Sequence, residues 1–539
     1  MSKFNKLILF FPVSLVTVAA LSGCSNDKGD TRVLRILNSE DYIYEYEEGD
    51  EEYDPEDDNR AYQMDMIDQF AAYWKDKYDE EIEVIYDTFD TNETMFNELK
   101  TGKTTYDICI PSDYMIQKLY ANDMLHKFVS KDAIWENISP FIDNVYSKIE
   151  ATNMSDNVTA SVSDYSVPYM WGTMGVMYNP NYYINNKGVT EDEIHELMTD
   201  WDSLYGEVLK GSFSIKDSVR DTFAVSLIHT YGEEIAEADH DTLTQIFNRH
   251  DEKTFEEVKT DMNKLKENAF GFETDSGKTD MTTQKIGANM CWSGDATWAI
   301  TEARDNDLEL YYSIPTSYNG EEGKGASNLW FDCFCMPKNA KDENNQTEEE
   351  MAQYALAEEF IEFMCQPENA AQNCYCVGYT PAVAGDAMLD YMYDCYDVRG
   401  VVGAEEIEDE DGEVTLVEDL VEDEDYILYD LSYFFEDSLS EEYKDLGAAV
   451  LYADPDYVGR ELSAQYPLYE TLDRCAIMND FGNKDTGNLL DMWESVRTNK
   501  LPTWGIILLC VEAAAGLGLG AYFIARKVSR KKLKKARNA

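Results

Sequence analysis

The chain has 539 residues, with 44 Lys and Arg against 107 Asp and Glu, and therefore a formal net charge of −63. This length allows two or three domains or one large two-lobed body, and 44% hydrophobic residues are enough to build cores. So acidic a chain is a poor partner for nucleic acid and a good one for cations.

The first 24 residues have the pattern of an export signal. Lys3 and Lys6 precede an apolar run from Leu7 to Leu21, and small residues follow before a cysteine. Leu21-Ser-Gly-Cys24 resembles the bacterial lipobox, in which the cysteine becomes the lipidated first residue of the mature protein. We predict a lipoprotein signal peptide over residues 1–24 with lipidation at Cys24; an ordinary signal peptide or an uncleaved anchor stays open.

From Thr31 the chain alternates strand-like and helix-like segments. Spacing of apolar residues predicts, in chain order, a strand over 32–37, a helix over 64–78, a strand over 83–86, a helix over 92–100, a strand over 106–110 and a helix from 116 onward. Asn92 is placed to cap the second of these helices. Such alternation predicts a parallel sheet covered on both faces, with binding sites in loops at the carboxyl ends of its strands.

The middle of the chain continues this pattern. We predict a β-rich segment over 164–179, a strand that ends at Trp292, an apolar strand over 328–337 and an amphipathic helix over 348–365. Two crossings, near 165–179 and 312–337, would divide the chain into two discontinuous lobes. The first lobe would comprise 31–168 and 318–395, and the second 169–317 and 396–500.

Two segments are strongly acidic, residues 45–58 and an insertion over 403–426. In the insertion, Asp409, Asp411, Gly412 and Glu418 match ligand or turn positions of an EF-hand loop, but Ile407 stands at its first position and cannot bind calcium. Asp411-Gly412 is also a favoured hairpin turn. We predict a solvated acidic hairpin, with calcium as the less favoured alternative.

The C-terminus predicts a membrane anchor. Trp504 to Ala525 contains one charge, Glu512, and at 1.5 Å per residue it is long enough to span a hydrocarbon core of about 30 Å. The basic tail over 526–539 should stay cytoplasmic, which leaves the acidic body on the outer face of the cell membrane. One transmembrane helix over 504–525 cannot form a pore, so any transport channel is another chain.

Motifs for catalysis and metal binding are absent from the sequence. There is no HExxH, GxSxG, P-loop or GxGxxG after a strand, and the cysteines lack the spacing of a zinc site. We predict no enzyme activity, no cofactor and no metal, and we expect the cysteines between Cys24 and Cys510 to be buried free thiols. Hydrolysis by paired carboxylates stays open as an alternative.

Six segments together resemble one family, the extracytoplasmic spermidine/putrescine-binding proteins of bacterial ABC transporters. In order they are NETMFNELK, YDICIPSDY, DYSVPYMWG, IKDSVRDTF, MCWSGDA and LWFDCFCMP, within a match over roughly 34–482. The resemblance implies an α/β chain with a two-lobed periplasmic-binding-protein type II fold. To this the sequence adds the predicted transmembrane helix.

The resemblance also implies a polyamine site in the cleft between the lobes. Carried over position by position, its residues are Glu40, Tyr42, Ser112, Tyr114, Asp221, Trp292, Trp330, Asp332 and Tyr379. The family has Trp-Thr where this chain has Ser39-Glu40, and an acid where it has Ser218. These departures could change the preference between putrescine and spermidine or replace the ligand with another cation.

The chemistry of a diamine fits this set. Two ammonium groups need carboxylates, and the methylenes between them need aromatic walls, where each cation–π contact contributes roughly 0.5–2 kcal/mol. We expect Asp332, between Trp330 and Tyr379, to bind one amine and Asp221, with Glu40, to bind the other.

The first functional hypothesis is therefore the substrate-binding component of an ABC importer, which captures putrescine or spermidine and delivers it to separate permease and ATPase subunits. A binding protein for another cation, such as thiamine or ferric iron, and an extracellular enzyme are the alternatives.

Overall fold

The computed structural model describes residues 31–46, 64–304, 306, 308–339, 343–396, 399–400, 406–408, 414–416 and 426–498. The predicted signal peptide with Cys24, most of the acidic segment over 45–58, the predicted transmembrane helix over 504–525 and the basic tail lie outside these residues. Within the described residues, no helix combines the length and apolar character needed to cross a membrane.

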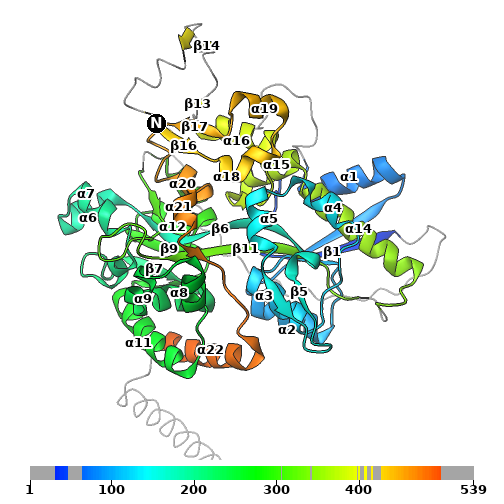
Figure 1. The fold of residues 1–539 in the computed structure, drawn as a ribbon, viewed down its shortest axis with the longest axis horizontal. Helices are drawn as coiled ribbons and strands as arrows, with labels where there is room; N and C mark the ends of the chain where they lie inside the picture. The colour runs from blue at the N-terminus through cyan, green and yellow to red at the C-terminus, as the bar shows by residue number, and fades with distance from the viewer. Residues whose placement is uncertain are drawn as a thin grey trace, which may run out of the picture.

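One mixed sheet of eleven strands organises the molecule (Figure 1). Its main path is β2-β1-β3-β11-β6-β9-β7-β8, with β10 and β12 paired to β6 and β18 paired to β11. The strands are β1 (Arg32–Asn38), β2 (Ile82–Thr88), β3 (Ile108–Cys109), β6 (Ser166–Tyr178), β7 (Phe213–Lys216), β8 (Gly271–Glu273), β9 (Ala288–Trp292), β10 (Tyr311–Ser313), β11 (Ser327–Cys335), β12 (Thr380–Pro381) and β18 (Cys475–Ala476).

The sheet consists of two parallel halves joined by two long antiparallel strands. β1, β2 and β3 pair in parallel at one end, and β7, β8 and β9 pair in parallel at the other. β6 and β11 run antiparallel to each other through the middle, and Figure 1 shows them connecting the two halves. The predicted parallel sheet is therefore correct within each half, whereas the two crossing segments form an antiparallel centre.

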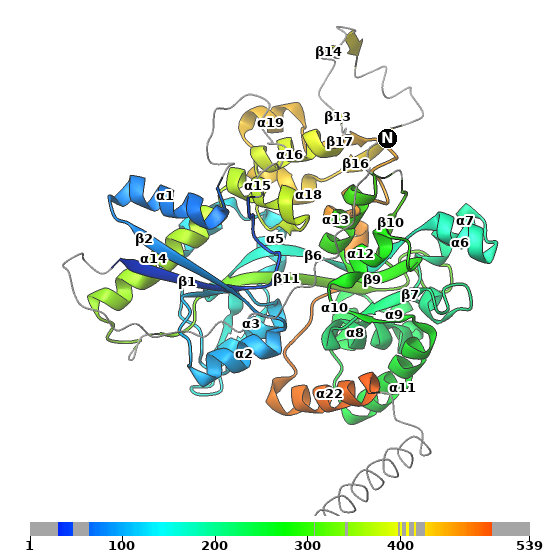
Figure 2. The same ribbon diagram turned by 180° about the vertical axis from the view of Figure 1, so that it is seen from behind.

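Helices cover both faces of this sheet, as the views in Figures 1 and 2 show. Before β6 they are α1 (Met66–Tyr78), α2 (Asn92–Thr101), α3 (Asp113–Ala121), α4 (Lys131–Ile134) and α5 (Pro140–Tyr146), beside the hairpin of β4 (Glu150–Thr152) and β5 (Thr159–Ser161). Between β6 and β11 they are α6 (Pro180–Lys187), α7 (Glu191–Leu197), α8 (Val219–Thr230), α9 (Gly232–Ala236), α10 (His240–Phe247), α11 (Glu252–Asn268), α12 (Ser276–Thr282) and α13 (Ser293–Arg304).

After β11 the chain adds α14 (Glu348–Met364), α15 (Pro367–Val377), α16 (Asp386–Tyr396), α18 (Ser432–Phe435), α19 (Glu441–Leu446), α20 (Glu461–Gln465), α21 (Tyr469–Leu472) and α22 (Gly482–Arg497). A small sheet of β13 (Arg399–Gly400), β17 (Val450–Ala453) and β16 (Ile427–Asp430) lies among them. The predicted acidic hairpin is confirmed in its strands, β14 (Glu406–Glu408) and β15 (Val414–Leu416), which pair antiparallel; the turn between them lies outside the described residues.

The C-terminal segment contacts both halves of the molecule. In α18, Phe434 stacks on Trp171 of β6 at 5.5 Å, and Tyr433 meets Phe141 of α5 edge-on at 5.1 Å. At the other half, Trp493 of α22 packs edge-on against Phe272 of β8. The boundaries of the two lobes stay a prediction, and residues 426–498 contribute to both halves rather than to the second alone.

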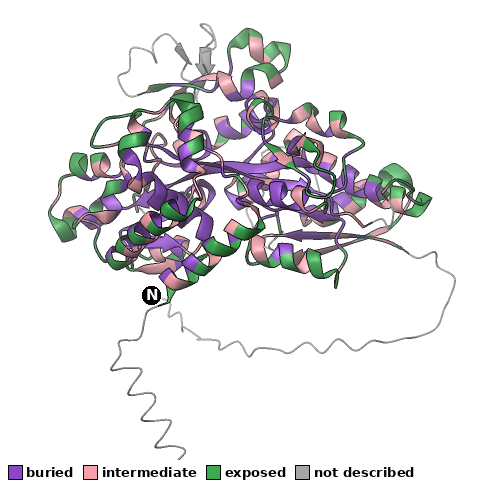
Figure 3. Ribbon diagram, turned by 60° about the horizontal axis from the view of Figure 1, so that its bottom comes forward, coloured by how far each residue is buried: buried purple, intermediate pink, exposed green. Residues whose placement is uncertain are grey.

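The core follows the central strands, where buried residues line the sheet and exposed ones line the outer helices (Figure 3). Nine cysteines lie in the described residues, and none of them forms a disulfide bond within that part of the chain. Seven are buried, as predicted, and Cys376 and Cys395 are partly accessible. The seven buried thiols therefore act as small apolar groups in the core.

Candidate functional site

Asp332 lies at an irregularity in the central strands. Asp332 is opposite Met170 on β6 while the next residue, Cys333, is opposite Pro168, so Tyr169 has no partner on β11. Such a β-bulge turns the strand locally and re-aims its side chains. A separate bridge pairs the backbone of Asp332 with Ser112, which places the loop between β3 and α3 beside the bulge.

Two neutral groups hold the Asp332 carboxylate. The Ser112 hydroxyl donates to Oδ1 at 2.7 Å, and the Tyr42 hydroxyl donates to Oδ2 at 2.8 Å. Burial raises the pKa of Asp332 to about 6, although both hydrogen bonds oppose that change, and the nearby Asp221 carboxylate raises it further. No Lys, Arg or His among the described residues forms an ion pair with it. Asp332 is thus a partly accessible carboxylate whose negative charge is unmatched.

Asn92 orients the Ser112 hydroxyl. Its amide donates to Ser112 Oγ at 3.0 Å and its Oδ1 accepts from the Ser112 backbone at 3.1 Å. The prediction that Asn92 caps α2 is wrong, because Thr91 and Thr94 form the capping box there. That pair leaves the Asn92 side chain free to reach Ser112, and the Thr-x-x-Thr spacing was the signal in the sequence.

Aromatic rings cluster beside the carboxylate. Tyr379 meets Tyr42 edge-on at 4.9 Å and lies 5.8 Å from Trp330. Two glycines make room for these rings: a Cβ at Gly172 would lie 2.6 Å from the Trp330 ring, and one at Gly294 would lie 2.2 Å from the Tyr379 ring. The predicted residues Tyr42, Trp330, Asp332 and Tyr379 are therefore brought together in one cluster.

A second carboxylate, Asp221, comes from the first turn of α8. It is buried, and the Trp292 indole at the end of β9 donates to its Oδ2 at 3.2 Å. Burial raises the pKa of Asp221, while hydrogen bonds from Ser218 and Trp292 and the charges of Arg220 and Lys216 oppose the increase. No cation among the described residues is within ion-pair distance of Asp221.

Two residues of the cluster, Lys216 and Asp295, were not among the predicted site residues. Lys216 ends β7, and its Nζ lies 2.6 Å from Asp295 Oδ2 and 4.3 Å from the centre of the Trp292 ring. The Tyr379 hydroxyl donates to Asp295 Oδ1 at 2.9 Å. Asp295 therefore connects Tyr379 with Lys216, which lies on the Trp292 ring. Lys216 is the second residue of the segment IKDSVRDTF, and this position was the available signal in the sequence.

Two predicted residues lie at the margin of the cluster. Tyr114 is buried, and its ring faces the Arg220 guanidinium at 4.6 Å rather than Asp332. The same guanidinium lies 4.1 Å from the ring of Phe481, so Arg220 connects α3, α8 and the start of α22. Glu40 is exposed, and its side chain makes no hydrogen bond or ion pair with the cluster in the described part of the chain.

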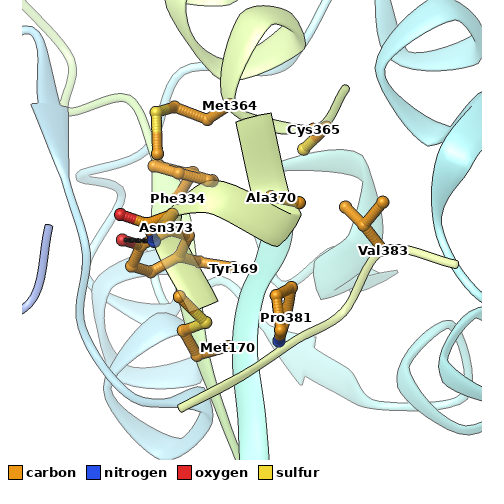
Figure 4. Close-up of a pocket in the computed structure, with 9 residues that line it drawn as sticks. All are labelled: Tyr169, Met170, Phe334, Met364, Cys365, Ala370, Asn373, Pro381 and Val383. Carbon is orange, nitrogen blue, oxygen red and sulfur yellow. Dashed lines mark hydrogen bonds between the residues drawn. The ribbon is translucent and has the colours of Figure 1, made fainter. Parts of the chain in front are cut away.

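A narrow void lies behind the cluster, lined by nine residues from β6, β11, α14, α15 and β12 (Figure 4). It has no room for a water molecule, so it is a packing defect rather than a binding site. The Asn373 amide donates to the Tyr169 hydroxyl at 2.7 Å, a bond drawn in Figure 4. That hydroxyl in turn donates to the Tyr42 carbonyl at 2.6 Å. These bonds fix the Tyr42 loop from the back.

Known proteins resemble this chain in sequence and in fold. The chain is 26% identical to the spermidine/putrescine-binding periplasmic protein of Escherichia coli over 312 residues, which cover 57% of this chain and 73% of the relative. It is 24% identical to the putrescine-binding periplasmic protein SpuD of Pseudomonas aeruginosa, with 69% and 83% covered.

A solved structure assigned to a spermidine/putrescine ABC transporter of Listeria monocytogenes matches with a TM-score of 0.53 at 20% identity, covering 87% of this chain and all of that one. This likeness shows a mixed α/β fold of the periplasmic-binding-protein kind. The family model of the bacterial extracellular solute-binding proteins matches residues 65–387. The chain therefore belongs to the family of bacterial extracellular solute-binding proteins.

Proposed function

We propose that this chain is the substrate-binding component of an ABC importer and that it captures a polyamine, putrescine or spermidine, between the two halves of its sheet. The observation that carries the proposal is Asp332: a carboxylate at a β-bulge, held by two neutral hydroxyls and flanked by aromatic rings, with no ion-pair partner among the described residues. Such a charge is costly to bury unless a ligand supplies the positive partner.

The second carboxylate makes the site suit a molecule with two cationic ends. Asp221 likewise lacks an ion-pair partner among the described residues, and it lies close enough to Asp332 to raise its pKa. Trp330 and Tyr379 lie beside Asp332, and Trp292 contacts Asp221. An ammonium at each carboxylate, with methylenes against the rings, satisfies all of these groups.

The relatives support this ligand class, since the named proteins bind spermidine and putrescine or putrescine. A metal ligand such as ferric iron is less well supported, because the described residues hold no cluster of three His, Cys, Asp or Glu side chains that could bind a metal. Solute-binding proteins deliver ligands without covalent chemistry, so an enzyme is not the favoured alternative.

We further propose that the acidic body lies outside the cytoplasmic membrane. A lipid on Cys24 and a helix over 504–525 would anchor it at both ends, and separate permease and ATPase subunits would carry the ligand across. Radiolabelled palmitate should enter the wild-type chain and not Cys24→Ser; labelling of the serine variant would contradict the lipid assignment.

The test of the binding site compares wild type with Asp332→Asn by calorimetric titration of putrescine and spermidine. The amide keeps the shape of the side chain and removes its charge, so we expect affinity to fall by at least about tenfold, roughly 1.4 kcal/mol. Glu349→Gln, an exposed acid at the start of α14, is the matched control and should bind as wild type does. Equal affinity of Asp332→Asn and wild type would contradict the assignment.

A further inference from the structure

Lys216 is a buried lysine inside the candidate site. Its side chain is 3% exposed, and it projects from the carboxyl end of β7, between the ends of β8 and β9. Its ammonium contacts Asp295 at 2.6 Å, Glu273 at 3.5 Å and the face of Trp292 at 4.3 Å. An ammonium on an indole face beside a carboxylate is the arrangement that a bound amine would adopt.

The carboxylates of the candidate site are therefore not equally available to a ligand. Asp295 already faces Lys216, and the Tyr379 hydroxyl and the Lys278 ammonium, at 3.9 Å, approach its other oxygen. Glu273 faces Lys216 and also accepts from the Gly277 backbone at 2.8 Å and from the Asn289 amide at 3.1 Å. Asp221 and Asp332 remain as the site carboxylates that form no ion pair in the described residues.

We propose that Lys216 is a resident ammonium that sets the charge of the ligand at two, so that the protein selects a diamine over triamines and tetraamines. This inference rests on the proposed polyamine-binding function and names the ligand within that class. Two free carboxylates match the two ammonium groups of a diamine. A third ammonium would meet Lys216 instead of a carboxylate, and like charges in a poorly solvated site repel strongly.

A purely structural role makes a different prediction. If Lys216 only holds the ends of β7, β8 and α13 together, its loss lowers the stability of the protein and weakens the binding of all polyamines alike. If Lys216 sets the ligand charge, its loss frees Asp295 and raises the affinity for the longer amines relative to that for putrescine. The ratio of two affinities therefore separates the roles, whereas either affinity alone does not.

The experiment titrates the full chain, in detergent, with putrescine, spermidine and spermine, for wild type, Lys216→Met and Lys216→Arg. Wild type should bind putrescine at least about tenfold more tightly than spermidine. Lys216→Met should shift that ratio by at least about tenfold toward spermidine, and Lys216→Arg should keep the wild-type preference because it keeps the charge. Lys285→Met, which removes an exposed lysine paired with Asp280 at 2.9 Å, is the control and should leave the ratio unchanged.

Wild type alone keeps the inference testable if Lys216→Met does not fold. A wild-type preference for spermidine or spermine over putrescine overturns it, and so does a folded Lys216→Met with an unchanged ratio. In both cases the chain still binds polyamines and the proposed function stands. Absence of saturable binding of any of the three amines by wild type would instead overturn the proposed function.

Discussion

At the scale of single residues, we expect the charge state of Asp332 to control the binding of a polyamine. Its pKa in the ligand-free protein is about 6, and a bound ammonium favours the carboxylate. Above pH 6 the site is already charged, whereas below it ligand must displace a proton. We expect the dissociation constant of putrescine to rise as pH falls below 6, approaching about tenfold per pH unit for this one group. Titrations from pH 5 to 8 test this, and a constant affinity across that range would contradict it.

The same carboxylate should destabilise the empty protein. Because folding raises its pKa above the ordinary value, the contribution of Asp332 to stability is favourable below about pH 4 and is lost as pH rises through about 6. At pH 7.5 and without ligand, Asp332→Asn should therefore raise the free energy of unfolding by about 1–2 kcal/mol. Urea unfolding measures this change, and a less stable variant would mean that the charge has a partner in the empty protein.

Single residues also mark what sequence could and could not predict. Ser112 and Asp332 were identified because each stands in a segment that resembles a family, and Tyr42 because it follows the first strand as the tyrosine of that family does. The structure joins the three by hydrogen bonds. Lys216 was missed because a lysine in a strand has the same appearance in sequence whether it faces solvent or a buried carboxylate. Its role depends on Asp295, which is 79 residues away.

At the scale of elements, the start of α13 sets the position of Tyr379. Gly294 lies under that ring, where a Cβ would approach it to 2.2 Å. Gly294→Ala should displace Tyr379 without unfolding the protein. The affinity for putrescine should then fall by at least about fivefold, because about 1 kcal/mol of contact with the ring is lost. Gly487→Ala, in α22, has open space at its Cβ and should bind normally. Circular dichroism confirms folding, and wild-type affinity in Gly294→Ala would argue against Tyr379 as a wall.

A second element-scale feature joins α8 to its neighbours. His229 of α8 contacts Asp202 at 2.9 Å and Asp261 of α11 at 3.0 Å, and its ring stacks on Tyr205 at 3.6 Å. Burial opposes the charge of His229, but the hydrogen bonds and charges of the two carboxylates prevail and raise its pKa to about 9.

Because that pKa is raised on folding, the stabilisation is fully present below about pH 6.5 and is lost as pH rises through about 9. We expect wild type to lose about 1–3 kcal/mol more than His229→Gln between pH 6.5 and 10. Urea unfolding at both pH values measures this difference. His240→Gln, an exposed histidine at the start of α10, is the control and should follow wild type; parallel curves for wild type and His229→Gln would contradict the charge assignment.

At the scale of the whole molecule, local periodicity predicted the strands and helices but not how the halves join. Crossings were expected near 165–179 and 312–337, and β6 and β11 lie within these segments. Their antiparallel pairing and the bulge at Asp332 depend on contacts between residues about 160 positions apart, which periodicity cannot report. Periodicity also could not predict that α18 packs on α5, a contact between distant residues that brings the C-terminal segment to the first half of the molecule as well as the second.

Because the net charge is −63, the main alternative to a specific polyamine site is that cations gather loosely on an acidic surface. The decisive measurement is calorimetric titration of the wild-type chain with putrescine and spermidine from about 0.1 to about 1 M salt, over which the Debye length falls from about 10 to about 3 Å. A built site with Asp332 and Asp221 predicts saturable binding of one polyamine per chain that persists in high salt. Weak heat from many sites that disappears as salt is added would contradict the polyamine-binding function, although the chain would keep its place in the family.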